Sequence, residues 1–375
     1  MKSDKKVVQR VPFNDLSPQW REISREAKLD FDEVFATGAF CLGPQVEAFE
    51  REIAEFLGVA HAIGVNSGTS ALHLAMVASN ICPGDEVLVP AHTFIATLWG
   101  VIYVGATPVL CDVDETTATI DLQDAERRVT SRTRAIIPVH LYGQPAEMDR
   151  VADFARHHNL LVIEDAAQSI GARWGGRSTG TLGSIGCFSF YPGKNLGAAG
   201  EAGLVVTHDA KAAARLHSLR HHGEVERYVH AEIGFNYRMD AIQAAVLRHK
   251  LRLIEKWTAH RRALAERFQT ALAGLPIDVP TVHHQDHVWH LFVIRTRARD
   301  RLRAYLSSAG IETGMHYPVP LHRQPCLQYL ALNRDDYPRA DRWANEGLSL
   351  PLFYGMTIAQ VDWTAGRIRE FFQGV

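Results

Sequence analysis

The sequence predicts an α/β protein with a large domain, built on a mainly parallel sheet, and a smaller C-terminal α+β domain. As far as Thr207, short apolar runs alternate with helix-like stretches, a pattern typical of a parallel sheet covered by helices on both faces. After Thr207 the pattern changes to long helical stretches. The length of 375 residues fits two or three domains, or one large unit with an appendage.

The first element is an arm, residues 1–20, and the large domain is predicted to follow over residues 21–255. Helix-like apolar spacing predicts a helix over residues 22–35, which Gly38 and the Gly43-Pro44 pair interrupt. From residue 45 to 57, apolar side chains recur at steps of three and four, which predicts an amphipathic helix.

Six apolar, β-branched runs are the predicted strands of the large domain, with helices between them. In such sheets ligands bind beyond the carboxyl ends of the strands, so we expect the functional residues there. The strands are residues 86–90, 107–112, 135–140, 160–165, 186–191 and 203–207, and the helices are residues 71–79, 122–128 and 148–158.

The C-terminal part begins with a strong helical pattern over residues 240–257, whose apolar stripe includes Ala244, Leu247 and Leu251. A second helix, or a continuation of the first, is predicted over residues 261–272. The small domain is predicted to span residues 256–375, with a strand at 288–294 and a helix at 299–309.

Composition excludes several classes of function. The net charge of −2 gives no basic excess for nucleic acid or for an anionic membrane surface, and no apolar run approaches the length of a membrane-spanning helix. The five cysteines are scattered and never form a CxxC pair, which argues against disulfides or structural zinc and indicates the cytoplasm.

Two of four local features suggest an anion site and a buried carboxylate. The small-residue turn Asn66-Ser67-Gly68-Thr69-Ser70-Ala71 opens a helix, where backbone N–H groups can bind a phosphate. Ordinary helix capping is the alternative. The pair Glu164-Asp165 ends a strand, and the pleat sends the two side chains to opposite sides, so only one can readily face a ligand. A helix cap by Asp165 is the alternative.

The other two features are a lysine and an arginine-containing segment. Lys194 follows a strand end and a Pro-Gly turn in an apolar, glycine-rich region, where desolvation would lower its pKa and make the neutral amine nucleophilic. A surface turn is the alternative. The segment 234–239 precedes the long helix, so Asn236 or Arg238 could bind an anion, or Asn236 or Asp240 could cap the helix, which is favoured for this motif alone.

Together the four features point to pyridoxal 5'-phosphate (PLP). This cofactor requires a lysine that forms a Schiff base, a phosphate cradle and a carboxylate on the pyridine nitrogen. A carboxylate there keeps the ring protonated, so that the ring can act as an electron sink.

The motifs also identify a family that the chain resembles. They are Val11-Pro12-Phe13-Asn14-Asp15-Leu16, Gly43-Pro44 with Phe49-Glu50, Ser67-Gly68-Thr69 with Ala71-Leu72, Pro83-Gly84-Asp85-Glu86-Val87, Val139-His140-Leu141-Tyr142-Gly143-Gln144, Glu164-Asp165-Ala166-Ala167-Gln168, Ser189-Phe190-Tyr191-Pro192-Gly193-Lys194-Asn195-Leu196, Gly234-Phe235-Asn236-Tyr237-Arg238 and His316-Tyr317-Pro318. With them the chain resembles, nearly end to end, the PLP-dependent nucleotide-sugar aminotransferases of the DegT/DnrJ/StrS group. The resemblance implies the type I PLP-dependent aminotransferase fold.

The resemblance implies a role for each matching residue. Lys194 is expected to carry PLP and to move the proton, and Asp165 to pair with the pyridine nitrogen. Gln168 is expected near the ring hydroxyl and Phe94 against the ring. The phosphate is expected to lie on Gly68, Thr69 and Ser189, with Asn236 contributed by the neighbouring subunit of a homodimer whose active sites are shared.

Several histidines and tyrosines are weaker candidates. Loop positions near the family's substrate place His222, Tyr228, His230, His316, Tyr317 and His322 as possible sugar or nucleotide contacts, with solvated or core positions as the alternatives. His217 and His221 lie four residues apart, but no HExxH motif or paired cysteine accompanies them, so no metal site is predicted. The sequence Gly200-Glu201-Ala202-Gly203 departs from the family pattern at Ala202, which could shift the lysine loop slightly.

The expected reaction is ping-pong transamination, in which L-glutamate donates the amino group and a nucleotide-linked keto sugar accepts it. A 6-deoxy sugar aminated at C3 or C4 fits the resemblance, in a pathway for surface polysaccharide, O-antigen or antibiotic sugars. Lys194 disfavours the family's dehydratases, which carry a histidine there. An aminotransferase for cyclitol ketones and a non-catalytic PLP-binding regulator remain as alternatives.

Overall fold

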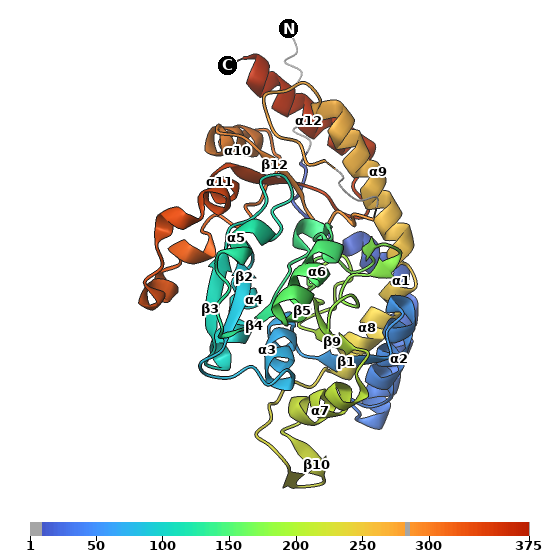
Figure 1. Cartoon of the computed structure of the whole chain (residues 1–375). Helices are drawn as coiled ribbons and strands as arrows, with labels where there is room; N and C mark the ends of the chain where they lie inside the picture. The colour runs from blue at the N-terminus through green and yellow to red at the C-terminus, as the bar shows by residue number, and fades with distance from the viewer. Residues whose placement is uncertain (1–9, 282–285, 375) are drawn as a thin grey trace.

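The computed structural model of the chain describes residues 10–281 and 286–374. At its centre is a seven-stranded sheet (Figure 1), formed by runs of apolar residues that are buried almost throughout. In spatial order its strands are β1 (His61–Val65), β9 (Gly203–Thr207), β8 (Ile185–Ser189), β5 (Leu161–Asp165), β4 (Thr133–Ile136), β2 (Glu86–Pro90) and β3 (Thr107–Cys111).

The sheet is mainly parallel, and β9 is the exception. It runs antiparallel to both of its neighbours, β1 and β8, whereas β8, β5, β4, β2 and β3 pair in parallel. Crossover connections of parallel strands are usually helical, and the helices of this part cover both faces. They are α1 (Ser17–Thr37), α2 (Pro44–Leu57), α3 (Gly68–Ala78), α4 (Ala96–Tyr103), α5 (Leu122–Glu126), α6 (Met148–His158), α7 (Ala210–Arg220) and α8 (Ala241–Leu251).

Two apolar clusters on opposite faces hold these layers together. On one face, α3 and α4 pack against the sheet around Leu74, Val89 and Val101. On the other, α2 and α8 pack against β8 and β9 around Phe49 and Leu247. Burial of such side chains is the main stabilising contribution of the fold.

The C-terminal part has a second core of its own, which includes Phe268, Phe292 and Ile368. Val11, from the N-terminal segment, also lies in this core and bridges to Ile311. Two antiparallel strands form its small sheet. The elements are α9 (Ile254–Leu272), β12 (Phe292–Arg295), α10 (Arg299–Ser308), α11 (Pro338–Glu346), β13 (Gly347–Leu350) and α12 (Ile358–Gln373).

Two short strand pairs and four 3-10 segments complete the described elements. The strands β6 (Arg173–Trp174) and β7 (Arg177–Ser178) pair with each other, as do β10 (Glu224–Glu226) and β11 (Val229–His230). The hairpin of β10 and β11 projects from the body at the end opposite α12 (Figure 1). Short 3-10 segments occupy Leu141–Gly143, Leu321–Arg323, Pro325–Leu330 and Arg334–Asp336.

The structure differs from the sequence prediction at several elements. The helix predicted over 240–257 is two helices, because the chain turns at Arg252 and Leu253 so that α8 packs on α1 and α2 whereas α9 packs on α12. The strand predicted over 135–140 ends at Ile136, because Pro138 has no N–H to continue the ladder and Val139 forms only an isolated bridge to Asp165. The sequence pattern predicts neither β1, α4 nor α7. Helix α4 is apolar on nearly every side, so it lacks the stripe that marks a helix.

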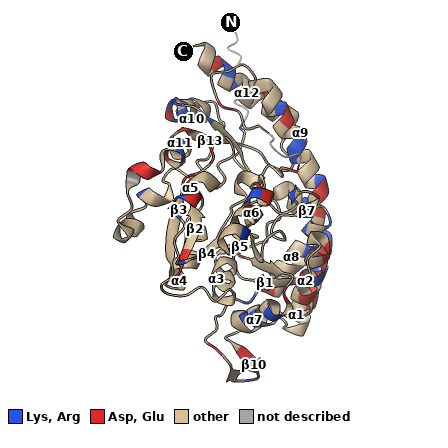
Figure 2. Cartoon of the chain, in the orientation of Figure 1, with Lys and Arg blue, Asp and Glu red and all other residues tan. Residues whose placement is uncertain are grey.

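The boundary at residue 255/256 lies in the first turn of α9 and stays a prediction. Charged residues of both signs are interspersed along the outer helices, α1, α2, α9 and α12 among them (Figure 2). Among the described residues, no helix is both long and apolar enough to cross a membrane.

Candidate active site

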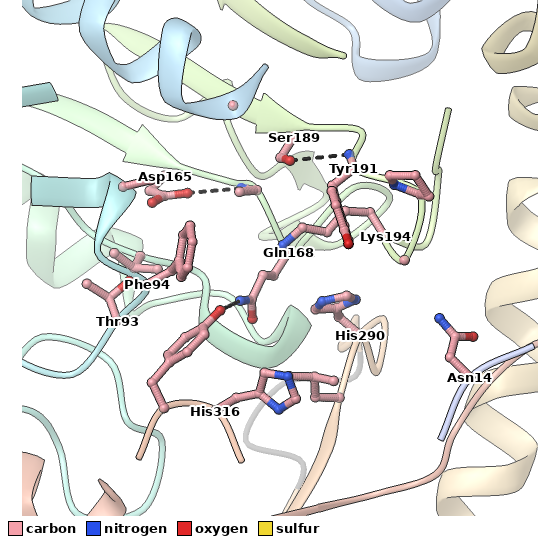
Figure 3. A pocket seen from close by; sticks show the side chains of 18 of the residues that line it. Asn14, Thr93, Phe94, Asp165, Gln168, Ser189, Tyr191, Lys194, His290 and His316 are labelled. Atoms are coloured by element: carbon pink, nitrogen blue, oxygen red, sulfur yellow. Dashed lines mark hydrogen bonds between the residues drawn. The ribbon is translucent and has the colours of Figure 1, made fainter. Parts of the chain in front are cut away.

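A cavity of about 860 Å³ opens where β5 and β8 end, between the central sheet and the C-terminal part of the chain. Its walls come from the N-terminal segment, the start of α3, the turn after β8 and the segments around β12 and β13 (Figure 3). Nine residues predicted from the sequence lie in this lining: Gly68, Thr69, Phe94, Asp165, Gln168, Ser189, Lys194, His316 and Tyr317.

The two carboxylates at the end of β5 face opposite sides, as the pleat requires. Asp165 faces the cavity. Glu164 is fully buried on the other side and accepts hydrogen bonds from the N–H groups of Gly180, Leu182 and Gly183 at 2.6–2.7 Å. His140 Nε2 is its fourth partner, at 2.8 Å. Four donors compensate the burial of this charge, so Glu164 fixes the strand end that carries Asp165.

Asp165 is held from the cavity side by α4. Its Oδ2 accepts a hydrogen bond from the Thr97 hydroxyl at 2.7 Å, and Thr97 in turn contacts the Thr93 hydroxyl at 2.9 Å. Its Oδ1 accepts from the N–H of Ala167 at 3.1 Å. Each carboxylate oxygen keeps a further lone pair, which can receive a proton donor in the cavity.

Lys194 lies on the turn after β8 and extends into the space bounded by Asp165, Phe94 and Gln168 (Figure 3). The backbone N–H of Lys194 donates to the backbone carbonyl of Tyr191 at 2.8 Å, which closes the turn. Burial lowers the pKa of Lys194 to about 8, against the opposing effect of Asp165. About a tenth of the amine is therefore neutral at pH 7, far more than for an exposed lysine, and this neutral form is the nucleophile.

The start of α3 and Ser189 meet at the other end of the cavity. Ser67 caps the helix by accepting from Ser70 N at 3.1 Å. The N–H groups of Gly68 and Thr69 precede any intrahelical acceptor and carry the positive end of the helix dipole. A Cβ added to Gly68 would lie 2.7 Å from Ser189 Cβ, so only glycine leaves this concavity open for an anion.

Gln168 is fixed by two segments. Its Oε1 accepts from Tyr142 N at 2.6 Å and its Nε2 donates to the Tyr317 hydroxyl at 3.0 Å, which leaves one amide hydrogen for a ligand. Tyr317 also contacts the half-exposed ring of Phe94, with 5.4 Å between ring centroids. His316 stacks on Phe13 and bonds Ser349 Oγ at 2.8 Å, and burial lowers its pKa to about 4.

The remaining predicted residues lie outside this cavity. Asn236 is exposed, and its carbonyl accepts from Asn66 Nδ2 at 3.3 Å. His222, Tyr228 and His230 are exposed on the projecting hairpin and its base. His322 is buried against Asp341, at 2.9 Å, beside a separate cavity of about 300 Å³.

The sequence reasoning missed four residues that the structure brings to the site. Thr97 holds Asp165, and Asn14, Arg261 and His290 line the cavity. Thr97 lies in the first turn of the unpredicted helix α4, and Thr93 lies four residues before it, ahead of the helix; a prediction of that helix would have drawn attention to Thr97. Asn14 lies in the motif Val11–Leu16, which gave no role for it, and Arg261 and His290 come from distant parts of the sequence and carry no local signal. No cluster that could hold a metal ion occurs within residues 10–281 and 286–374.

The lining fits the cofactor that the sequence predicts. The open concavity at Gly68 and the free first-turn N–H groups suit a phosphate. Lys194 makes no side-chain hydrogen bond within the described chain, and it faces Asp165 across the cavity. An amine, a carboxylate and an anion cradle are the groups that PLP requires, and here they share one cavity.

Comparison with known proteins gives matches along the whole chain. The model of the DegT/DnrJ/EryC1/StrS aminotransferase family matches residues 21–369. A dTDP-3-amino-3,4,6-trideoxy-alpha-D-glucose transaminase from Streptomyces venezuelae is 46% identical over 375 residues, covering 100% of this chain and 99% of that protein.

Two solved structures share the fold. One is DesV of S. venezuelae in complex with a ketimine intermediate, with a TM-score of 0.95 and 44% identity over 98% of this chain and 99% of that one. The other is NtdA from Bacillus subtilis with bound cofactor PMP, with a TM-score of 0.90 and 30% identity over 99% of this chain and 87% of that one.

Proposed function

The chain belongs to the DegT/DnrJ/EryC1/StrS aminotransferase family and is a PLP-dependent aminotransferase, and from this we propose that it transfers the amino group of glutamate to the ketone of a nucleotide-linked keto sugar. The observation that carries the proposal is Lys194, with its lowered pKa, in one cavity with Asp165 and the α3 N-terminus. The relative from S. venezuelae is a transaminase of a dTDP-linked 3-amino sugar, which supports C3 of a 6-deoxy sugar.

The cavity residues divide the tasks of binding and proton transfer. Lys194 Nζ would hold PLP covalently, and Asp165 would hold a proton on its pyridine nitrogen. Gly68, Thr69 and Ser189 would bind the phosphate, Phe94 would cover the ring and Gln168 would donate to its hydroxyl. When bound, PLP withdraws electrons from the substrate carbon that exchanges its amino group.

Lys194 is the proton carrier of this site. In its neutral form, Nζ can accept a proton from the substrate carbon, and the resulting ammonium can return it. A base with a pKa of about 8 is suited to both directions near neutral pH. His316 and His290 stay neutral because burial lowers the pKa of each, so neither competes for that proton at pH 7.

A spectrum of the purified protein tests the proposal. We expect a visible PLP band that bleaches when glutamate is added and returns when a nucleotide-linked 3-keto-6-deoxy sugar is added. Alanine in place of glutamate is the control for the donor, and a free cyclitol ketone is the control for the acceptor. A band that glutamate leaves unchanged would refute the donor, and recovery with the cyclitol alone would refute the nucleotide sugar.

The projecting hairpin supports a homodimer with shared sites. Tyr228 between the two strands is 78% exposed, and Ile233, just after the hairpin, is 90% exposed; the hairpin projects from the body (Figure 1), and none of its residues lines the cavity of its own chain. An exposed apolar tip is typical of a contact with another protein. We place Asn236, His222, Tyr228 and His230 at the cavity of a second copy.

Complementation tests the sharing of sites. A Lys194→Ala chain and a Tyr228→Ala chain, coexpressed, would form mixed dimers in which one site has both intact residues. Random assembly then restores up to about a quarter of wild-type activity. If the hairpin served its own chain, mixing would restore none. A solution mass near the 41.8 kDa of one chain would refute the dimer.

The five cysteines are all free, which supports a reducing, cytoplasmic location.

A further inference from the structure

Lys250 is a buried cation without a counter-ion. It lies near the end of α8 and is only 5% exposed. In the described part of the chain it forms no ion pair with a carboxylate, and burial lowers its pKa to about 8. An unpaired buried ammonium is unfavourable, and an apolar side chain of similar length would avoid that cost. The presence of an ammonium here therefore requires an explanation other than packing.

The two acceptors of Lys250 lie on two segments that both contribute to the cavity lining and that meet at Gly193 and Asn14. Its Nζ donates to Gly197 O at 2.7 Å, on the loop that follows Lys194. It also donates to Gln19 Oε1 at 3.2 Å, in the first turn of α1. The residue before that helix, Leu16, lines the cavity together with Asn14.

The loop after Lys194 is tied to the C-terminal part by the buried Asn195, whose Nδ2 donates to Val288 O at 2.8 Å and whose Oδ1 contacts His290 Nδ1 at 3.2 Å; Lys250 is its tie on the side of α8. A Cβ at Gly197 would lie 2.2 Å from Pro192 O, so the loop folds tightly on itself. Two N–H groups close it, those of Lys194 to Tyr191 O and of Ala198 to Phe190 O, both at 2.8 Å. The carbonyl of Gly197 points outward to Lys250, which is its link to α8.

We propose that Lys250 is a positioning residue for Lys194, because it ties the Lys194 loop and the start of α1 to α8 and so sets the cavity-facing position of the amine. The purpose of this role, to position a catalytic amine, rests on the proposed function. The contact between Lys250 and Gly197 does not, and it can be measured without a cofactor. An ammonium suits the task since it can donate to two acceptors on different segments at once.

Hydrogen exchange of the cofactor-free protein tests the tie. In Lys250→Met, the amides of residues 191–198 should exchange about three- to tenfold faster than in wild type, the range for loss of one or two hydrogen bonds. Strand β2 (Glu86–Pro90) should not change. Lys256→Met is the matched control, since Lys256 is an exposed lysine that pairs with Glu22. If Lys250→Met does not fold, Lys250→Leu, which also lacks a donor, replaces it.

A second readout separates positioning from support of the fold. Labelling of the amine, followed at Lys194 by mass spectrometry across pH, gives the pKa of Lys194 in the cofactor-free protein. That pKa should rise in Lys250→Met, because a loosened loop admits water that stabilises the ammonium. It should not move in Lys256→Met.

Three outcomes would overturn the proposal. They are unchanged exchange in residues 191–198, faster exchange spread evenly over the core, and an unmoved pKa of Lys194. All are independent of the reaction. A wild-type protein that binds no PLP would refute the proposed function and leave this exchange result standing.

Discussion

Replacing Lys194 by methionine should stabilise the cofactor-free protein near neutral pH. Burial lowers the pKa of Lys194 from 10.5 to about 8, so at pH 7 the folded state holds an ammonium that its surroundings disfavour. At about 1.4 kcal/mol per pH unit, this difference amounts to about 3 kcal/mol of folding free energy. Methionine fills similar space without the charge, so Lys194→Met should gain about 2–3 kcal/mol at pH 7.

The gain should disappear as the pH rises. Between pH 8 and 10.5 the unfolded lysine binds more protons than the folded one, so the wild type gains stability with pH in that window. At pH 10 most of the penalty is relieved, and the variant should exceed the wild type by less than about 1 kcal/mol. Lys250, whose pKa is also about 8, is present in both proteins and cancels.

Urea unfolding of PLP-stripped protein, at equal protein concentration and at pH 7, 8, 9 and 10, measures these differences. Lys256→Met is the control, because Glu22 raises the pKa of Lys256 and its titration lies above the window. A difference in unfolding free energy between wild type and Lys194→Met that stays constant from pH 7 to 10 would refute the reasoning. So would a variant that is less stable at pH 7.

Three further changes test the frame of the site. Glu164→Ala leaves three backbone N–H groups and His140 without their acceptor, so urea unfolding should show a loss of about 3–5 kcal/mol; a loss below about 1 kcal/mol would contradict this role. Gly68→Ala would crowd Ser189 and should raise the PLP dissociation constant at least about tenfold in an absorbance titration. Gly366→Ala, which places a methyl group in open space on α12, is the control and should leave that constant unchanged. Asp165→Asn keeps a partner for the Thr97 hydroxyl and should fold normally by circular dichroism, yet lose about 10²–10³-fold in kcat; near-normal turnover would exclude Asp165 from catalysis.

The fold class could be predicted because the local patterns of the large domain agree with its tertiary structure. Buried parallel strands such as β2 and β5 appear as continuous apolar runs. The type I aminotransferase fold that the resemblance implied is confirmed by structures with TM-scores of 0.95 and 0.90. What local patterns could not give is the break between α8 and α9, which depends on the different partners of the two helices.

The candidate site was predictable where a short motif fixes the geometry. The opposite directions of Glu164 and Asp165 follow from the pleat, and the anion cradle follows from a helix start. The contact of Gly68 with Ser189, the hold of Thr97 on Asp165 and the link from Lys250 to Gly197 each join residues far apart in sequence. The periodicity of a single sequence gives no information about contacts between such distant residues. The roles of the hairpin residues stay predictions.

The back-to-back carboxylates of β5 have a consequence for how this protein can change length during evolution. Glu164 pairs in register with Gly186 and Asp165 with Cys187. A deletion or insertion of one residue within β5 would move the strand by one position and exchange the two faces. The Glu164 carboxylate would then lose its four hydrogen-bond donors, and a side chain that now packs in the interior would face the cavity in place of Asp165. Insertions should therefore accumulate in the exposed turn at Asn159, and the spacing from β5 to Gln168 should be preserved even where residue identities drift.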